Sequence, residues 1–213
     1  MLKKRIFLIV VLSIFAFISV LYFYQKKSIK DEQNSTYQLQ AHEIEKIREG
    51  DIILRHGYGI ISDMIVKVGK EPYPISHCGV VCKDEKQNWI VIHTVSNTLT
   101  AIDGMQSDPL AVFVKNSKEN SIIVVRYKNT NDSCTKLFTQ QAFYYLNKKV
   151  PFDDRFDSND SSALYCTEFI RQLYLDVYHT DIYSQYSTDM LRFSPFLNEK
   201  LFDIIVLDKK KKD

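Results

Sequence analysis

The sequence predicts an α+β domain, with a mainly antiparallel sheet and helices packed on one side of it. Two observations lead to this prediction. Short segments dense in β-branched residues follow one another in the middle of the chain, separated by polar turns, and segments with helical spacing of apolar residues lie on either side of them. With 213 residues, of which 45% are hydrophobic, the chain can form one domain with a substantial core.

The expected elements follow one another along residues 42–207. A helix is predicted at 42–48 because Gly50 ends it, and a short apolar strand follows at 51–55. The apolar segment 60–68 has mixed helical spacing and is expected to cover one face of the core. The later elements are predicted strands at 76–82, 89–95, 99–102, 121–127 and 204–207, a short helix at 109–114, and helices at 136–146 and 167–178.

The first 27 residues differ in kind from the rest. Three basic residues at 3–5 precede an uncharged run at 6–24, which two lysines at 26 and 27 end. At about 1.5 Å per residue this run is roughly 28 Å long, close to the hydrocarbon thickness of a bilayer and longer than the core of a cleavable signal. We therefore predict a signal anchor with its basic end in the cytoplasm and the domain on the extracytoplasmic side. The lysines after the run reduce the charge difference on which this orientation depends. A buried core helix is the alternative interpretation of the run.

The rest of the chain divides into a polar tether at 28–40, a globular domain at 41–208 and a basic tail at 209–213. Residues 28–208 carry 19 basic against 25 acidic side chains, so the body of the protein is acidic. Binding of nucleic acid normally requires a basic face that displaces counterions. The composition therefore excludes nucleic acid as an expected partner, and the tail is interpreted as a solvated end.

Cys166 is the first candidate for chemistry, because it stands where a polar loop gives way to an amphipathic helix. The unpaired amides and the positive dipole end at a helix start stabilise a thiolate and lower its pKa. The same amides can donate to the oxyanion that forms when the sulfur attacks a carbonyl. The alternative is an inert core cysteine.

His77 is the candidate base, and it lies in the first strand of a predicted hairpin whose second strand carries His93. Any antiparallel register in which paired residue numbers sum to an even value near 170 places both imidazoles on one face. Direct pairing of His77 with His93 would leave residues 83–87 as the turn. A base with an orienting polar group beside it is what nucleophilic catalysis needs, while core or surface histidines are the alternative.

Four motifs follow one another in the chain: Gly50-Asp51-Ile52-Ile53-Leu54-Arg55, Ser76-His77-Cys78-Gly79-Val80, Pro151-Phe152-Asp153 and Tyr165-Cys166-Thr167-Glu168-Phe169. Together they resemble the permuted papain-like cysteine hydrolases of the NlpC/P60 superfamily, in particular the YiiX/YaeF-like group. The similarity runs from about residue 50 to residue 175, and the order of histidine before cysteine marks the permuted branch.

The resemblance implies a permuted papain-like fold in which Cys166 and His77 form the catalytic pair. His93 takes the place of the third residue, where many members have an acid. Tyr165, beside the nucleophile, and Asp51, in the Gly-Asp start, are candidate substrate-binding residues. Fixing the local turn is the alternative role of Asp51.

Metal sites are the main competing interpretation. His77, Cys78, Cys82 and His93 are potential zinc ligands, but alternation along a strand turns the two cysteines away from His77. The acidic loop at 153–160 lacks the glycine and the terminal glutamate of a calcium loop. No metal and no organic cofactor is expected, and at most one disulfide, involving Cys134, is compatible with a free Cys166.

The sequence thus predicts thiolate attack on an amide or ester carbonyl, outside the cytoplasmic membrane. Stem peptides of the cell wall and acyl chains of lipids or lipoproteins are the two expected substrate classes, and the membrane is the expected partner of the N-terminal helix. A non-catalytic domain that binds peptide or lipid on the same fold is the alternative function.

Overall fold

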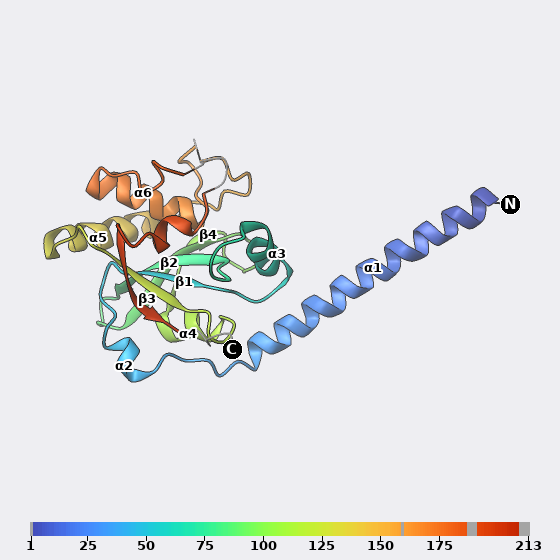
Figure 1. The fold of residues 1–213 in the computed structure, drawn as a ribbon, viewed down its shortest axis with the longest axis horizontal. Helices are drawn as coiled ribbons and strands as arrows, with labels where there is room; N and C mark the ends of the chain where they lie inside the picture. Colours follow the sequence, from blue (N-terminus) through green and yellow to red (C-terminus); the bar gives the residue numbers. More distant parts are fainter. Residues whose placement is uncertain (1, 159, 187–190, 209–213) are drawn as a thin grey trace.

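The computed structural model describes residues 2–158, 160–186 and 191–208, so the predicted basic tail at 209–213 lies outside the described residues. A long N-terminal helix, α1 (Leu2–Gln33), projects from a globular α+β part (Figure 1). The helices of that part are α2 (Ala41–Ile44), α3 (Ile60–Gly69), α4 (Leu110–Lys115), α5 (Asp132–Lys148), α6 (Cys166–Tyr178) and the 3₁₀ turn η1 (Ser194–Leu197).

A six-stranded antiparallel sheet forms the centre of the globular part, as predicted. The strands lie side by side in the order β4-β3-β2-β1-β5-β6. Their bounds are β1 (Ile52–Arg55), β2 (His77–Lys83), β3 (Trp89–Val95), β4 (Gly104–Pro109), β5 (Ile123–Tyr127) and β6 (Phe202–Leu207).

Both faces of the sheet are covered, whereas the sequence led us to expect helices on one side only. Helices α5 and α6 pack on one face, and α4 with the segment around α2 lies against the other (Figure 1). The reason lies in the central strands, which are apolar at successive positions such as Val80 with Val81 and Val91 with Ile92. A strand with this pattern must be buried on both faces.

The edge strand also differs from the sequence prediction. The segment predicted as a strand at 99–102 is a loop, and β4 forms at Gly104–Pro109 instead. Leu99 and Ile102 are exposed despite their apolar side chains, and Met105 enters the core. Gly104 begins β4 with a φ of 76°, and a Cβ atom there would lie 2.2 Å from the carbonyl oxygen of Val150. The chain therefore enters the sheet only where a glycine allows this close approach. The helix predicted at 42–48 is likewise shorter and spans only α2.

Helix α3 forms where an apolar helical segment was predicted, and its partly buried Ile65 packs against the core. None of its ten residues, all of them described, is buried. Met64 and Val68 are 58% and 62% exposed, and Ile61 is also exposed. Most of the apolar stripe of this helix thus stays exposed beside the core.

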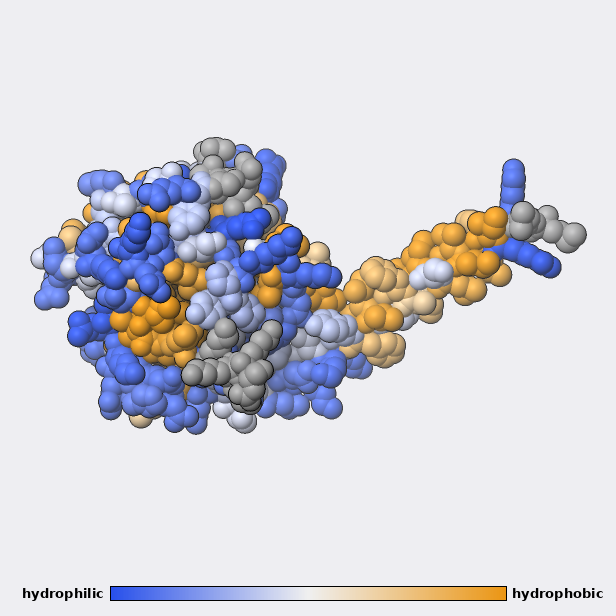
Figure 2. Space-filling view, viewed as in Figure 1, coloured by the Kyte–Doolittle hydropathy of each residue, from blue (hydrophilic) through white to orange (hydrophobic). Residues whose placement is uncertain are grey.

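Helix α1 continues past the apolar run to Gln33, into the stretch expected to be a polar tether. It is long and apolar enough to cross a membrane, as a membrane anchor or a signal sequence would be. Figure 2 shows it as an apolar rod beside a largely hydrophilic globular surface. Its last turns contact the start of α3: the Ile60 N–H donates to Gln25 Oε1 (3.1 Å), and the Gly59 N–H donates to Ser28 Oγ (2.8 Å).

The β2–β3 hairpin has the register Val80↔Ile92, so that paired numbers sum to 172. This even sum places His77 and His93 on one face, as expected, but they are diagonal neighbours and the turn is 84–88, not 83–87. Gly79 lies against His93, and a Cβ atom on it would be 2.6 Å from Val91 Cγ1 and 3.0 Å from His93 Cβ. A glycine is needed here for space.

We predict that Gly79→Ala lowers the free energy of unfolding by about 1–3 kcal/mol, because the added methyl overpacks the hairpin. Chemical denaturation measures this change. Gly69→Ala is the matched control, since a Cβ atom there meets only Glu71 Cγ, at 3.5 Å. Equal stability of the two variants would contradict the prediction.

Candidate active site

Cys166 is the first residue of α6, and its sulfur lies where β2 and β3 separate. The pairing of these two strands ends at Val80↔Ile92. The segment that leads into α6 forms hydrogen bonds with residues of both strands beyond that point. Thr94 Oγ1 donates to the Leu164 carbonyl oxygen (3.1 Å), and the Cys78 N–H donates to the Cys166 sulfur. The nucleophile predicted from the sequence is thus held against the residue that follows His77.

Hydrogen bonds favour the ionised form of this sulfur. A hydrogen bond from the Cys78 thiol, and then the N–H groups of Cys78, Thr167 and Cys166, lower the pKa of Cys166 against the opposing effect of burial. Burial raises the pKa of the partner thiol, Cys78, so that it stays protonated and donates. The predicted role of the helix start is therefore visible as specific N–H donors.

On the other side of β2, three side chains form a hydrogen-bonded chain across three strands. His77 Nε2 lies 2.9 Å from His93 Nδ1, and His93 Nε2 lies 3.1 Å from Asp108 Oδ2. The structure brings together the two histidines that the sequence singled out. It adds Asp108, from β4, which sequence reasoning missed.

The chain of contacts fixes the tautomers of both histidines. The hydrogen bond from His93 lowers the pKa of Asp108, which is therefore an ionised acceptor, so His93 Nε2 carries the proton that it donates. Because burial lowers the pKa of His93, the ring is neutral and its Nδ1 accepts from His77 Nε2–H. The unprotonated nitrogen of His77 is then Nδ1, the ring nitrogen nearest its own backbone.

Arg55 is a second polar residue that the sequence analysis missed, and it pairs with His77 in the register of β1 and β2. Its guanidinium lies 4.0 Å from the centre of the Phe113 ring, and Nη1 donates to the Phe113 carbonyl oxygen (2.9 Å). Its buried Nε has no hydrogen-bond partner among the described residues. Burial lowers the pKa of Arg55 to about 10, while Asp108, Glu32 and the Cys166 thiolate favour its charged form.

The electrostatics keep the His77 ring neutral. Burial, then the Arg55 charge and then the electrostatic effect of His93 hold the pKa of His77 well below its usual value. A neutral imidazole can accept a proton at neutral pH, whereas an imidazolium cannot.

The two predicted substrate-binding residues have different positions. Tyr165 lines a pocket beside Cys166, and its hydroxyl accepts from the Leu191 N–H (3.1 Å). Asp51 is four residues before Arg55 on β1, about 13 Å along the strand. Its carboxylate is buried and bonded to Arg126 Nε (2.7 Å) and the Arg48 N–H (2.8 Å). Asp51 thus lies away from Cys166, and its hydrogen bonds are those of a residue that fixes the turn before β1.

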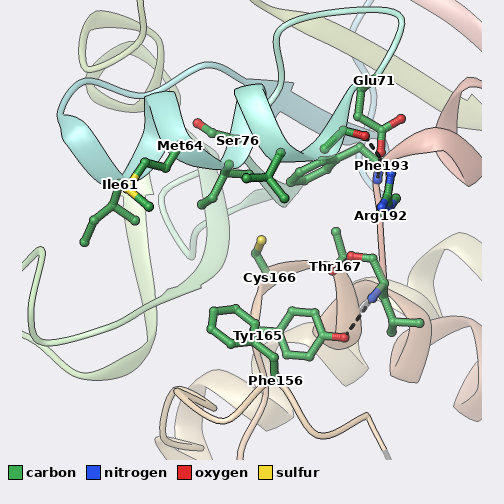
Figure 3. A pocket seen from close by; sticks show the side chains of 14 residues that line it. Ile61, Met64, Glu71, Ser76, Phe156, Tyr165, Cys166, Thr167, Arg192 and Phe193 are labelled. Atoms are coloured by element: carbon green, nitrogen blue, oxygen red, sulfur yellow. Dashed lines mark hydrogen bonds between the residues drawn. The ribbon is translucent and has the colours of Figure 1, made fainter. Parts of the chain in front are cut away.

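A hollow of about 310 Å³ opens at Cys166. Figure 3 shows the Cys166 side chain directed into it, between Ile61 and Met64 of α3 on one side and Tyr165 and Phe156 on the other. The polar side chains of Glu71 and Arg192 lie near Phe193, at one end of the hollow. The site is therefore a thiol at the floor of a mostly apolar pocket.

In the described part of the chain, His, Cys, Asp and Glu side chains form no group of three or more that is arranged to hold a metal ion. Cys78 and Cys82 are buried in the core on the α6 side, as strand alternation led us to expect. The facing nitrogens of His77 and His93 are hydrogen-bonded to each other. All four cysteines, each in a described position, are free.

Fold and family together define a papain-like cysteine hydrolase. The model of the family described as permuted papain-like amidase enzymes of the YaeF/YiiX type, family C92, matches residues 46–193, and the chain belongs to this family. The crystal structure of YiiX from Escherichia coli O157:H7, described as a metalloprotein, is similar with a TM-score of 0.62. The two chains are 14% identical, and the similarity covers 78% of this chain and 99% of that one. The curated proteins gave no match.

We predict that Cys166 is alkylated by iodoacetamide faster than the other three cysteines at pH 7. Its lowered pKa means that the rate rises with pH and levels off at a lower pH than for a free cysteine. Mass spectrometry of peptides at a series of pH values measures each site. Faster labelling of Cys134, or a Cys166 rate that still rises above pH 9, would contradict the prediction.

Proposed function

We propose that the protein hydrolyses amide or ester bonds with Cys166 as the nucleophile, His77 as the base, and His93 and Asp108 as positioning residues. The observation that carries this proposal is the hydrogen-bonded chain His77–His93–Asp108, which ends at His77, the residue before the Cys78 whose N–H donates to the Cys166 sulfur. A base oriented by a further polar group is the general requirement for activating a nucleophile.

The reaction follows from the assigned tautomers. The Cys166 thiol gives its proton to His77 Nδ1, and the thiolate attacks the carbonyl carbon to form a C–S bond. The N–H groups of Cys166 and Thr167 are donors available to the oxyanion. His77 then protonates the leaving amine or alcohol, and water cleaves the thioester to release the acid and restore the thiol.

His93 and Asp108 act through His77 in this scheme. As His77 takes up the proton, its Nε2–H continues to donate to His93, whose own proton is held by the Asp108 carboxylate. The Asp108 carboxylate thereby stabilises the positive charge that develops on His77, two residues along the hydrogen-bonded chain. It does so without a carboxylate in direct contact with the base, which distinguishes this arrangement from the serine-protease template.

We further propose that α1 anchors the domain on the extracytoplasmic side of a membrane. The uncharged run at 6–24 and the three basic residues before it support this proposal. The two substrate classes are then cell-wall stem peptides and acyl chains of lipids or lipoproteins. Incubation of the full chain with peptidoglycan fragments and with phospholipids, followed by mass spectrometry of the products, tests the function. No turnover of either by wild type would favour a binding domain.

We predict a graded loss of turnover along the hydrogen-bonded chain. His77→Ala should be inactive, whereas His93→Ala should lower turnover by about 10 to 10³, because cysteine needs less activation than a hydroxyl. His93→Asn should retain more activity than His93→Ala, since an amide can still accept from the His77 N–H. Asp108→Asn should lower turnover by about 10 to 10², because the neutral amide leaves the His93 tautomer free.

Steady-state kinetics and the pH profile of these four variants measure the gradient, with circular dichroism as the check on folding. His93→Ala and Asp108→Asn with the activity of wild type, beside an inactive His77→Ala, would show that the two residues have no positioning role.

We predict that protease added to intact spheroplasts digests the domain, because the proposed anchor places it outside the cytoplasmic membrane. Detergent should be needed to release the undigested chain from membranes. Protection of the domain until lysis would reverse the orientation, and a soluble chain without residues 1–27 would identify α1 as a cleaved signal.

A further inference from the structure

Cys166 has a second thiol beside it. The Cys78 thiol and the backbone N–H of the same residue both donate to the Cys166 sulfur. The two residues come from different elements, β2 and α6, which pack against each other. A sulfur that accepts from both groups of one residue lies close to the Cα and Cβ atoms of that residue. A bond between the two sulfurs therefore requires rotation of side chains and little movement of the backbone.

The two sulfurs differ in their access to solvent. Cys166 lines the hollow, and Figure 3 shows its side chain directed into it. Cys78 is 0% exposed and belongs to the core on the α6 side of the sheet. A small oxidant that enters the hollow therefore meets Cys166 and not Cys78. The ionised form of Cys166, which its hydrogen bonds favour, is the form that peroxides oxidise.

The other two cysteines are farther from the nucleophile. Cys82 lies four residues from Cys78 on β2, about 13 Å along the strand. Cys134 lies in the first turn of α5, and the segment just before that helix is hydrogen-bonded to the last residue of α6. That end of α6 is about 18 Å from Cys166 along the helix axis. Of the four cysteines, all of which the structure describes, Cys78 is thus the one placed to react with an oxidised Cys166.

We propose that Cys166 and Cys78 form a reversible oxidation site, at which a hydroperoxide converts the two thiols into a disulfide. In the first step the Cys166 thiolate attacks hydrogen peroxide, the O–O bond breaks, and hydroxide leaves. The sulfur is thereby oxidised by two electrons to a sulfenic acid. In the second step the Cys78 sulfur attacks the Cys166 sulfur and the S–O bond breaks. The oxygen leaves as water, with the proton of the sulfenic acid and that of the Cys78 thiol.

The disulfide would protect the nucleophile from irreversible damage. A sulfenic acid without a partner thiol reacts with more peroxide to give a sulfinic acid, which thiols do not reduce, whereas a dithiol restores the disulfide to two thiols. This proposal goes beyond hydrolysis but rests on the ionised Cys166 of the proposed function. The proposed extracytoplasmic position adds to it, because disulfides persist in that oxidising environment.

Peroxide treatment of the full-length protein in detergent micelles tests the pair. After trypsin digestion of wild type, one linked species should join residues 71–83 to residues 156–171, with a mass about 2 Da below the sum of the two peptides. Dithiothreitol should remove this species and restore the labelling of Cys166 by iodoacetamide. Residues 71–83 contain both Cys78 and Cys82, so fragmentation of the linked species is needed to locate the bond.

Two variants provide a matched comparison, Cys78→Ala and Cys82→Ala, since both side chains are 0% exposed on the same face of β2. In Cys78→Ala the linked species should be absent, and Cys166 should gain about 32 Da as the sulfinic acid. The labelling that dithiothreitol recovers should fall by about tenfold relative to wild type, because the sulfinic acid is not reduced. Cys82→Ala should behave as wild type. Circular dichroism checks the fold, and Cys78→Ser is the second variant for the same position.

The possible failures are distinguishable. Equal recovery in the two alanine variants, a bond located at Cys82, or sulfinic acid as the product in wild type would overturn the disulfide and leave Cys166 as the nucleophile. A wild-type Cys166 that peroxide does not oxidise would overturn both the disulfide and the ionised thiol of the proposed function. None of these readouts uses turnover, so a failure to find a substrate would leave them unchanged. The fragmentation of the wild-type species also holds without any variant.

Discussion

The register of strands β2, β3 and β4 is the constraint on which the site depends. His77, His93 and Asp108 come from three strands, and they meet only because each pairing places its polar residue on the same face. A shift of one residue in either pairing would send one of these side chains to the opposite face, into the core beneath α6. Gly79 supports this register, because any side chain there would collide with the strand that carries His93.

The hydrogen-bonded chain His77–His93–Asp108 and the Cys166 sulfur are stabilised by different means. Burial keeps the two imidazoles neutral, and the Arg55 charge reinforces this effect on both. The sulfur is surrounded by N–H donors and the Cys78 thiol, which favour its ionised form. The site therefore combines a neutral His77 imidazole with a thiol whose negative charge is stabilised independently of an imidazolium.

The sequence predicted those parts of the structure that depend on local patterns. Alternation in the β2–β3 hairpin placed both histidines on one face, and the change from a polar loop to an amphipathic segment located Cys166 at a helix start. Asp108 was missed because β4 is an edge strand with polar residues and a terminal proline, a pattern that also describes a loop. The neighbouring segment at 99–102, with the apolar Leu99 and Ile102, was chosen in its place.

Other features depend on tertiary packing that no local pattern encodes. The apolar periodicity of α3 is the same for a helix that covers a core and for one that lines an open pocket, so its exposure was not predictable. Arg55 appeared to be the last residue of a short strand, and its role arises only from the pairing with His77 and the contact with Phe113.

The contacts between α1 and α3 also restrict rotation. Tyr24, Gln25 and Ser28 are each hydrogen-bonded to the start of α3, so the globular part cannot turn about the axis of α1 without breaking these bonds. The opening of the Cys166 hollow therefore keeps one orientation relative to that axis. A catalytic domain on a flexible tether samples many orientations before it binds a substrate. The contacts between α1 and α3 restrict those orientations in advance, so less rotational entropy is lost on binding.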